Sequence, residues 1–255
     1  MPTQVGSQAV DRASALLALV VESGGPRSFT SLVDELGLAK STTSRLLQAL
    51  ERSRLLQRDQ SGAFRPGALF SIYAARPSAL HDLAELARPT LARIGELSGE
   101  TVNLSVPRGH EVVQIAQVDS RYLLGSTNWV GVDVPAHCTA LGKVLFAYGA
   151  LPLPRGNLER RTAHSPVDGA QLEHMLVEVR RRGWAVSLDE LEDGLAAVGA
   201  PVRAVDGAVA AAVSVSGPTT RINNQGITRL GDLLVTETRG LSAQLGHNPG
   251  REGVA

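Results

Sequence analysis

Cysteine is almost absent from this sequence, which has a single one, Cys138, among 255 residues. One cysteine cannot form a disulfide within the chain, and such scarcity is typical of proteins that fold in a reducing compartment. We therefore expect a cytoplasmic protein.

Long hydrophobic runs are missing as well. The longest candidate, residues 13–21, lies between Arg12 and Glu22 and is far shorter than the ~20 apolar residues that a membrane-spanning helix needs. Its apolar positions have helical spacing, so we expect a first buried helix and no membrane partner.

Net charge is also lacking, because 25 Lys and Arg balance 25 Asp and Glu. A neutral chain is not expected to coat nucleic acid indiscriminately. The cations are nevertheless concentrated: residues 40–65 contain six cations and two anions, a net charge of +4. Lysine occurs only at Lys40 and Lys143, which we attribute to an arginine-rich genome.

Residues 29–67 follow the pattern of a helix-turn-helix with a basic hairpin, or wing. Thr30 is the expected N-cap of the first helix, and Gly37 supplies the turn. In the second helix, Thr43, Leu46, Leu47 and Leu50 share one face, while small hydroxyl and cationic side chains share the other. Two strand-like pieces then flank a turn at 59–62.

Such a helix fits the DNA major groove, which is about 12 Å wide. We expect Arg45 with its hydroxyl and amide neighbours to contact bases, and Lys40, Arg58 and Arg65 to contact phosphates. The complete predicted DNA-binding set is Lys40, Ser41, Thr42, Ser44, Arg45, Gln48, Arg58 and Arg65. The alternative is a small helical domain whose polar face only meets water.

The remainder of the chain alternates helical and strand-like patterns. A helical stripe contains Leu80, Leu83, Leu86, Leu91, Ile94 and Leu97, and Pro89 should cause a break or kink near Ala87 and Arg88. Strands are expected over 101–106, 111–118 and 208–216, the last with Val209 facing the same way as Val213. Helices are expected over 139–148, 168–182 and 224–245.

Four blocks resemble the IclR-type transcriptional regulators, and the resemblance extends over residues 9–246. The blocks are GLAKSTTSRLLQALERSRLL, GVDVPAHCTALGKVLFA, RRRGWAVSLDELEDGLAAVGAPV and AAAVSVSGP. The resemblance implies an α+β protein with a winged helix-turn-helix (9–67), a linker helix (68–79), a GAF-like α/β effector-binding domain (80–246) and a disordered tail (247–255). It also implies a dimer or tetramer that binds operator DNA.

Carried over from the family, the effector pocket comprises Leu123, Val134, Ala140, Leu141, Ser187, Ala197, Ser214 and Ser216. The first turn of a helix presents unpaired amides that favour an anion such as a carboxylate. Two serines at i and i+2 of one strand can point into one cavity. Alternatively, Thr139 is only a helix cap and the serines only line a polar sheet edge.

The chain departs from the family pattern at several positions. Ser187 and Ala197 replace a common aspartate and a common cysteine, which removes polar groups from the expected pocket. We therefore expect an effector bulkier or more apolar than a two-carbon acid, with Trp129 near the mouth. Before and after the hairpin, Arg54 replaces a common glycine and Pro66 a common apolar residue.

An enzyme, with the N-terminal unit as an interaction module, is the rival interpretation. No nucleophile elbow is present, and the motif around Gly142 lacks the residues of a phosphate-binding loop, with His137 and Val144 at two key positions. The acidic run 189–193 favours a solvated face over a metal site. An architectural DNA-binding protein would not need the large second domain. We expect no catalytic residues, cofactor or metal.

Overall fold

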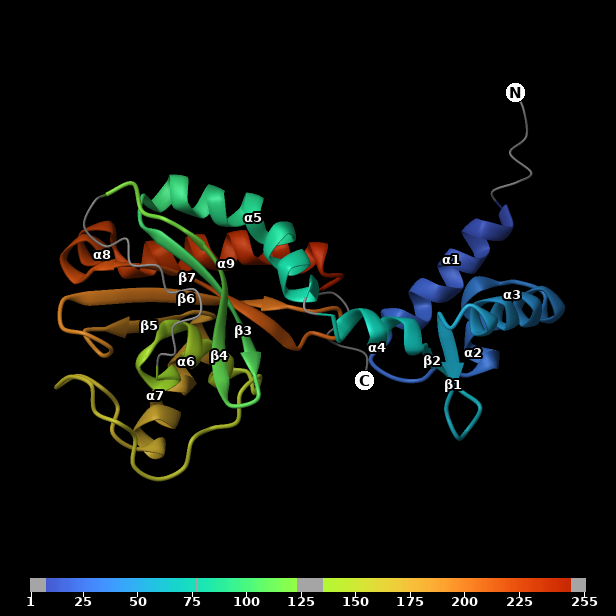
Figure 1. The fold of residues 1–255 in the computed structure, drawn as a ribbon, viewed down its shortest axis with the longest axis horizontal. Helices are drawn as coiled ribbons and strands as arrows, with labels where there is room; N and C mark the ends of the chain where they lie inside the picture. Colours follow the sequence, from blue (N-terminus) through green and yellow to red (C-terminus); the bar gives the residue numbers. More distant parts are fainter. Residues whose placement is uncertain (1–7, 77, 123–134, 249–255) are drawn as a thin grey trace. The chain divides into compact units, whose positions relative to one another are not determined.

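The computed structural model describes residues 8–76, 78–122 and 135–248 (Figure 1). The chain forms two compact units, Met1–Ala79 and Leu80–Ala255. Each unit has its own hydrophobic core.

Three helices and a hairpin form the first unit. Helices α1 (Gln8–Val21), α2 (Phe29–Leu36) and α3 (Lys40–Arg52) precede strands β1 (Leu56–Arg58) and β2 (Phe64–Pro66). Their shared core is Leu16, Val20, Leu32, Leu47, Leu50, Leu56 and Phe64. Helical spacing of the apolar residues in α1 and α3 produces this core, so the winged helix-turn-helix is confirmed.

Helix α2 begins two residues earlier than the sequence indicated. Its N-cap is Ser28, whose hydroxyl accepts a hydrogen bond from the Ser31 amide, and Thr30 lies inside the first turn. The predicted cap was therefore wrong: both hydroxyl residues suit the position, and the start of the helix decides between them. Gly37 ends the helix with φ of 62°, as the turn requires.

The hairpin closes where its sequence departs from the family pattern. Arg54 has φ of 59°, a left-handed conformation that glycine adopts more readily. Gly67 packs against that backbone, since a Cβ there would lie 2.2 Å from the Arg54 carbonyl oxygen. At the tip, Oδ1 of Asp59 accepts hydrogen bonds from the amides of Ser61 and Ala63.

The segment after the hairpin is helical over a shorter range than expected. Helix α4 covers Ala68–Ala74, and α5 (Ser78–Ser98) begins four residues later. Pro77 stands between them in the sequence, and proline disfavours a helical conformation in the residue before it.

Helix α5 runs through Pro89 without interruption, so of the expected break or kink near Ala87 and Arg88 the break does not occur. Pro89 lies on the exposed side, where the carbonyl that it leaves unpaired can meet water. The predicted stripe was also partly wrong. The buried positions are Ala84, Ala87, Leu91 and Ile94, whereas Leu80, Leu86 and Leu97 are exposed. Alanines share the inward face and let the helix approach the sheet closely.

A five-stranded antiparallel sheet organises the second unit, in the order β4-β3-β7-β6-β5. Its strands are β3 (Thr101–Arg108), β4 (Glu111–Val118), β5 (Ala185–Leu188), β6 (Leu195–Arg203) and β7 (Val209–Pro218). The sequence predicted β3, β4 and β7. It missed β5, which is only four residues long, and the glycine- and alanine-rich β6.

Helices cover both faces of this sheet (Figure 1). Helices α5 and α9 (Ile227–Gln244) lie on one face, over a core that includes Leu104, Val198 and Val213. On the other face, α6 (Ala140–Ala147) and α7 (Gly169–Arg182) enclose a second core with Leu145 and Leu172. A short 3-10 turn, η1 (Ala136–Cys138), leads into α6.

Two further predictions needed correction. The last helix is divided at Gly226 (φ of 86°) into α8 (Thr219–Gln225) and α9. A register shift between Val202 and Arg203 places Val209 in the α6–α7 core, on the opposite face from Val213. An irregular pairing of this kind interrupts the alternation of faces along a strand.

Candidate functional site

Helix α3 separates a buried face from a polar one. Thr43 and Leu47 are fully buried, whereas Lys40, Ser41, Arg45 and Gln48 are exposed. The two remaining predicted members, Thr42 and Ser44, are half-buried beside them. Ser41, Ser44, Arg45 and Gln48 thus lie on one accessible side of the helix, with Lys40 and Thr42 at its margins.

The amino end of α3 offers unpaired donors. Its N-cap is Ala39, whose side chain cannot accept a hydrogen bond, so no side chain caps the first turn. The first helical hydrogen bond is donated by the Thr43 amide to the Ala39 carbonyl, at 3.0 Å. Free amides and a cation at Lys40 suit an anion such as a DNA phosphate.

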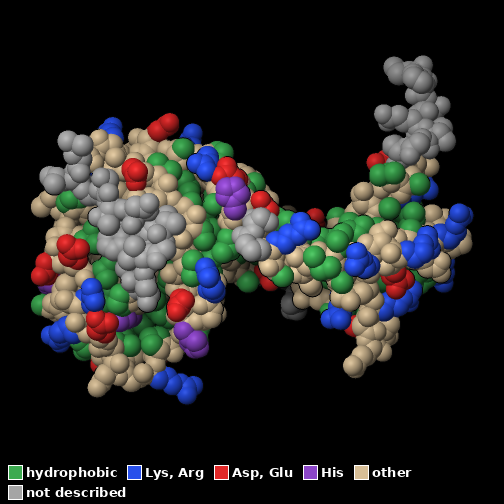
Figure 2. Space-filling model, viewed as in Figure 1, with side chains coloured by type: hydrophobic (Ala, Val, Ile, Leu, Met, Phe, Trp, Pro, Cys, Tyr) green, Lys and Arg blue, Asp and Glu red, His purple; other side chains and the backbone are tan. Residues whose placement is uncertain are grey.

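The two cations of the wing have different surroundings. Arg58 forms an ion pair with Glu51, with Nε 3.0 Å from Oε1, and its guanidinium lies 4.3 Å from the centre of the Phe64 ring. Arg65 is exposed and forms no ion pair with any described residue. Lys and Arg side chains gather over α3 and the wing in Figure 2. Of the two cations predicted to contact phosphate, Arg65 is therefore the one without an ion pair among the described residues.

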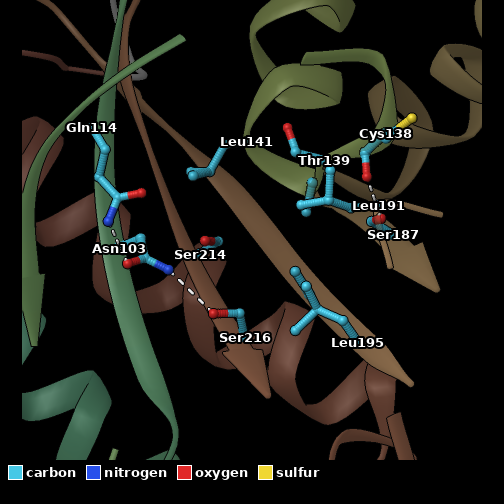
Figure 3. Close-up of a pocket in the computed structure, with 12 residues that line it drawn as sticks. Asn103, Gln114, Cys138, Thr139, Leu141, Ser187, Leu191, Leu195, Ser214 and Ser216 are labelled. Carbon is cyan, nitrogen blue, oxygen red and sulfur yellow. Dashed lines mark hydrogen bonds between the residues drawn. The ribbon is translucent and has the colours of Figure 1, made fainter. Parts of the chain in front are cut away.

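A cavity of about 60 Å³ lies in the second unit, between the sheet and the start of α6 (Figure 3). Its lining combines polar and apolar side chains: Asn103, Gln114, Cys138, Thr139, Ala140, Leu141, Ser187, Leu191, Leu195, Ala197, Ser214 and Ser216. Six of the predicted effector residues, Ala140, Leu141, Ser187, Ala197, Ser214 and Ser216, are among them. The other three, Leu123, Trp129 and Val134, lie outside the described residues.

One end of the cavity is built by the first turn of α6. Thr139 is the N-cap, and its hydroxyl accepts from the Gly142 amide and donates to the Ala136 carbonyl. In the part of the chain that the structure describes, nothing accepts a hydrogen bond from the amides of Ala140 and Leu141. Two buried donors at the start of a helix are suited to an anion.

The opposite wall is polar because of strand pairing. Asn103 of β3 pairs with Ser214 of β7, and Ala197 of β6 pairs with Ser216. Ser214 is only 2% exposed, and its hydroxyl has no hydrogen-bond partner among the described residues. Ser214 lines the cavity, so its hydroxyl can donate a hydrogen bond to an acceptor on a ligand.

Sequence reasoning missed several lining residues, above all Asn103 and Gln114. The available signal was the alternation of polar side chains with Val102 and Leu104. That alternation showed a polar face but not which strands lie beside it. Long-range pairing brought β3, β4 and β7 together.

The turn between β5 and β6 forms another wall of the cavity, and side chains from α6 and from the segment before α7 bind it. The Nζ atom of Lys143 lies 2.5 Å from the Glu190 carboxylate and donates to the Val186 carbonyl. Thr162 and Ser165 donate to the carbonyls of Asp189 and Glu190. Ser187 donates to the Cys138 carbonyl at 2.6 Å, so its hydroxyl proton is not available to a ligand.

The acidic run 189–193 is therefore only partly a solvated face. Glu192 and Asp193 are exposed, but Glu190 is buried, contrary to the prediction. Burial raises the pKa of Glu190 and lowers the pKa of Lys143, and the attraction between the two charges opposes both shifts. The Glu190 carboxylate is buried against Lys143 of α6, which also donates to the Val186 carbonyl of β5.

No grouping typical of catalysis accompanies the cavity. Cys138 is buried, and burial raises the pKa of its thiol, which disfavours the reactive thiolate. Across residues 8–76, 78–122 and 135–248, no group of His, Cys, Asp and Glu could hold a metal ion. Over the same ranges, no helix has the length and apolarity to cross a membrane.

Comparison with known proteins identifies both units. Residues 9–60 match the IclR helix-turn-helix domain, and residues 78–243 match the domain described as bacterial transcriptional regulator IclR C-terminal. The HTH-type transcriptional regulator BhcR of Paracoccus denitrificans is 32% identical, over 93% of this chain and 87% of its own. The HTH-type transcriptional repressor AllR of Escherichia coli K12 is 31% identical, over 95% and 92%.

Solved structures show the same fold. The IclR of Thermotoga maritima aligns with a TM-score of 0.62 at 25% identity, covering 93% of this chain and 98% of its own. An IclR homologue of Microbacterium hydrocarbonoxydans, complexed with 4-hydroxybenzoate, aligns with a TM-score of 0.56 at 20% identity, covering 93% and 99%. The chain belongs to the IclR family of transcriptional regulators, which are DNA-binding proteins with an effector-binding domain and not enzymes.

Proposed function

We propose that this chain is a repressor that holds operator DNA through α3 and the wing, and releases it when a small carboxylate enters the cavity. The observation that carries the effector half is the pair of unpaired amides at Ala140 and Leu141 at one end of the cavity, with the Ser214 hydroxyl on the opposite wall. The similarity to proteins named repressors supports the direction of regulation.

The DNA half rests on the accessible side of α3. Arg45 and Gln48 are one turn apart on that side and have the side chains that form bidentate contacts with bases. Lys40, the free first-turn amides and Arg65 supply phosphate contacts, which position the protein without reading sequence. Arg58 contributes less, because Glu51 already neutralises its charge.

The effector half rests on hydrogen-bond donors that line a partly apolar cavity. Carboxylate oxygens accept hydrogen bonds, so they match amides at a helix start. Leu141, Leu191 and Leu195 line the rest, which favours an effector larger or more apolar than a two-carbon acid. The 4-hydroxybenzoate in a structural neighbour supports an aromatic carboxylate as one such ligand.

Fluorescence anisotropy with a labelled fragment of the DNA upstream of the gene tests this function. Binding should be sensitive to salt, because neutralising phosphates releases counterions. Aromatic and branched carboxylates should release the DNA at lower concentrations than glyoxylate. Preferential release by glyoxylate would contradict the expected ligand size, and DNA binding that no carboxylate changes would contradict the effector class.

We also propose that the chain assembles as a dimer or tetramer. Helix α4 has no buried residue, and Leu69, Ile72 and Tyr73 are 40–47% exposed. Exposed apolar side chains close together are typical of protein interfaces. Light scattering during size-exclusion chromatography should show a dimer or larger species, and Ile72→Glu should reduce its size.

A further inference from the structure

Asn103 and Gln114 belong to a chain of hydrogen bonds that starts at the exposed Asp119. Oδ1 of Asp119 accepts from Nε2 of Gln117 at 2.6 Å, and Oε1 of Gln117 accepts from Nε2 of Gln114 at 3.1 Å. The same Gln114 nitrogen donates to Oδ1 of Asn103 at 2.7 Å, and Nδ2 of Asn103 donates to Ser216 at 3.2 Å.

The carboxylate at one end gives this chain of bonds its direction. An ionised carboxylate only accepts, so Gln117 must turn its nitrogen toward Asp119 and its oxygen toward Gln114. Gln114 then uses both of its N–H protons, one on Gln117 and one on Asn103. Its oxygen, Oε1, has no donor among the described residues.

That oxygen points into the cavity, on the side of Leu141 (Figure 3). The cavity therefore presents a neutral acceptor at Gln114 and unpaired donors at Ser214 and at the start of α6. A ligand that satisfies both must carry a hydrogen-bond donor as well as an anionic acceptor. The Gln114 oxygen thus gives the cavity a hydrogen-bond acceptor, although Ser187 and Ala197 replace the aspartate and the cysteine that are common in the family.

We propose that the cavity selects a hydroxylated carboxylate, with Gln114 Oε1 accepting the ligand hydroxyl. The inference rests on the proposed effector function and adds a second recognition point to it. The ligand carboxylate lies against the amides of Ala140 and Leu141, and the ligand hydroxyl donates to the Gln114 Oε1 atom, which accepts no hydrogen bond from the described residues. Asp119 and Gln117 act as positioning residues, because they orient the Gln114 amide.

Isothermal titration calorimetry with matched pairs of acids tests this selection. The probes are 4-hydroxybenzoate and 3-hydroxybenzoate against benzoate, and lactate against propionate. In the wild-type protein, at least one hydroxy acid should bind about tenfold more tightly than its partner, because a site built around a hydroxyl leaves an acceptor unpaired without it.

Gln114→Met keeps the length of the side chain and removes the amide. It should reduce the hydroxyl preference to about twofold or less while leaving the affinity for the acid without hydroxyl nearly unchanged. Gln244→Met, an exposed position at the end of α9 outside the cavity, is the matched control and should retain the wild-type preference.

Asp119→Asn tests the same inference without altering the core, because Asp119 is exposed. An asparagine can donate as well as accept, so the direction of the bonds is no longer imposed and the preference should fall to between those of wild type and Gln114→Met. Equal affinity within every pair, or a preference that survives in both variants, would overturn the inference and leave the carboxylate response intact. If no carboxylate bound, the proposed effector class would fail with it.

Discussion

Single side chains decide how the DNA-binding surface works, and the surroundings of each cation separate their roles. Arg45 is exposed on α3 without an ion pair among the described residues, as is Arg65 on the wing. Arg58 shares its charge with Glu51. Position on the helix or the wing then decides whether a cation reaches a base edge or a phosphate.

Arg45→Ala should reduce the discrimination between operator and random DNA by about 1–3 kcal/mol, because a bidentate base contact is lost. Competition anisotropy with the two DNAs measures this difference. An equal loss of affinity on both would show that Arg45 contacts only the backbone.

Arg65→Ala should weaken binding to all sequences alike and reduce the slope of log K against log salt concentration by about one unit. Arg58→Ala is the matched substitution on the same hairpin, and its effect on the slope should be smaller because Glu51 is already paired with it. The reverse order of the two slopes would contradict this assignment.

At the scale of elements, close backbone contacts at two glycines position the wing and the first turn of α6. Arg54 has φ of 59°, and Gly67 contacts its carbonyl where the hairpin closes. In the second unit, Gly142 lies beneath η1, since a Cβ there would be 2.0 Å from the Ala136 carbonyl oxygen. The missing side chain allows the backbone of η1 to lie directly against the first turn of α6.

Gly67→Ala should destabilise the first unit by about 1–3 kcal/mol, because the new Cβ meets backbone atoms that cannot move aside. Thermal unfolding followed by far-UV circular dichroism, together with operator affinity, measures the effect. Gly24→Ala is the control, because a Cβ at Gly24 meets nothing within 4 Å. Similar unfolding temperatures for the two variants would argue against the close packing at Gly67.

The Lys143–Glu190 ion pair should be important for the wall of the cavity. Lys143→Met leaves the Glu190 carboxylate buried and unpaired, which should cost about 3–5 kcal/mol, and adding Glu190→Gln should recover part of this loss. Denaturation followed by tryptophan fluorescence measures both. The exposed pair Arg181–Glu178 is the control, and Arg181→Met should have no measurable effect.

At the scale of the whole molecule, the two units give separate signals. Both tryptophans, Trp129 and Trp184, lie within 80–255, so fluorescence reports on the effector unit alone. A ligand at 100 times its Kd should stabilise that unit by about 2.7 kcal/mol. Arg45→Ala should leave this stabilisation unchanged, and a weaker effect in that variant would indicate that α3 influences the cavity.

The sequence predicted the elements whose signals are local. Periodic apolar residues marked α1, α3 and α7, alternation marked β3 and β4, and Thr139 was correctly identified as the cap of α6. Errors arose where two residues suit one role, as with Ser28 and Thr30, or where a local rule opposed packing, as at Pro89. Small residues hid β6 and the inward face of α5, because alanine and glycine give weak hydrophobic signals.

The family, the polar face of α3 and the first turn of α6 could be predicted from the sequence, because these features depend on residues close together along the chain. Tertiary structure alone decided that Asn103 and Gln114 face the same space as Ser214 and Leu141. The buried ion pair between Lys143 and Glu190 also depends on the tertiary structure. Strand order and pairing join residues about a hundred positions apart, and no local pattern records which strands become neighbours.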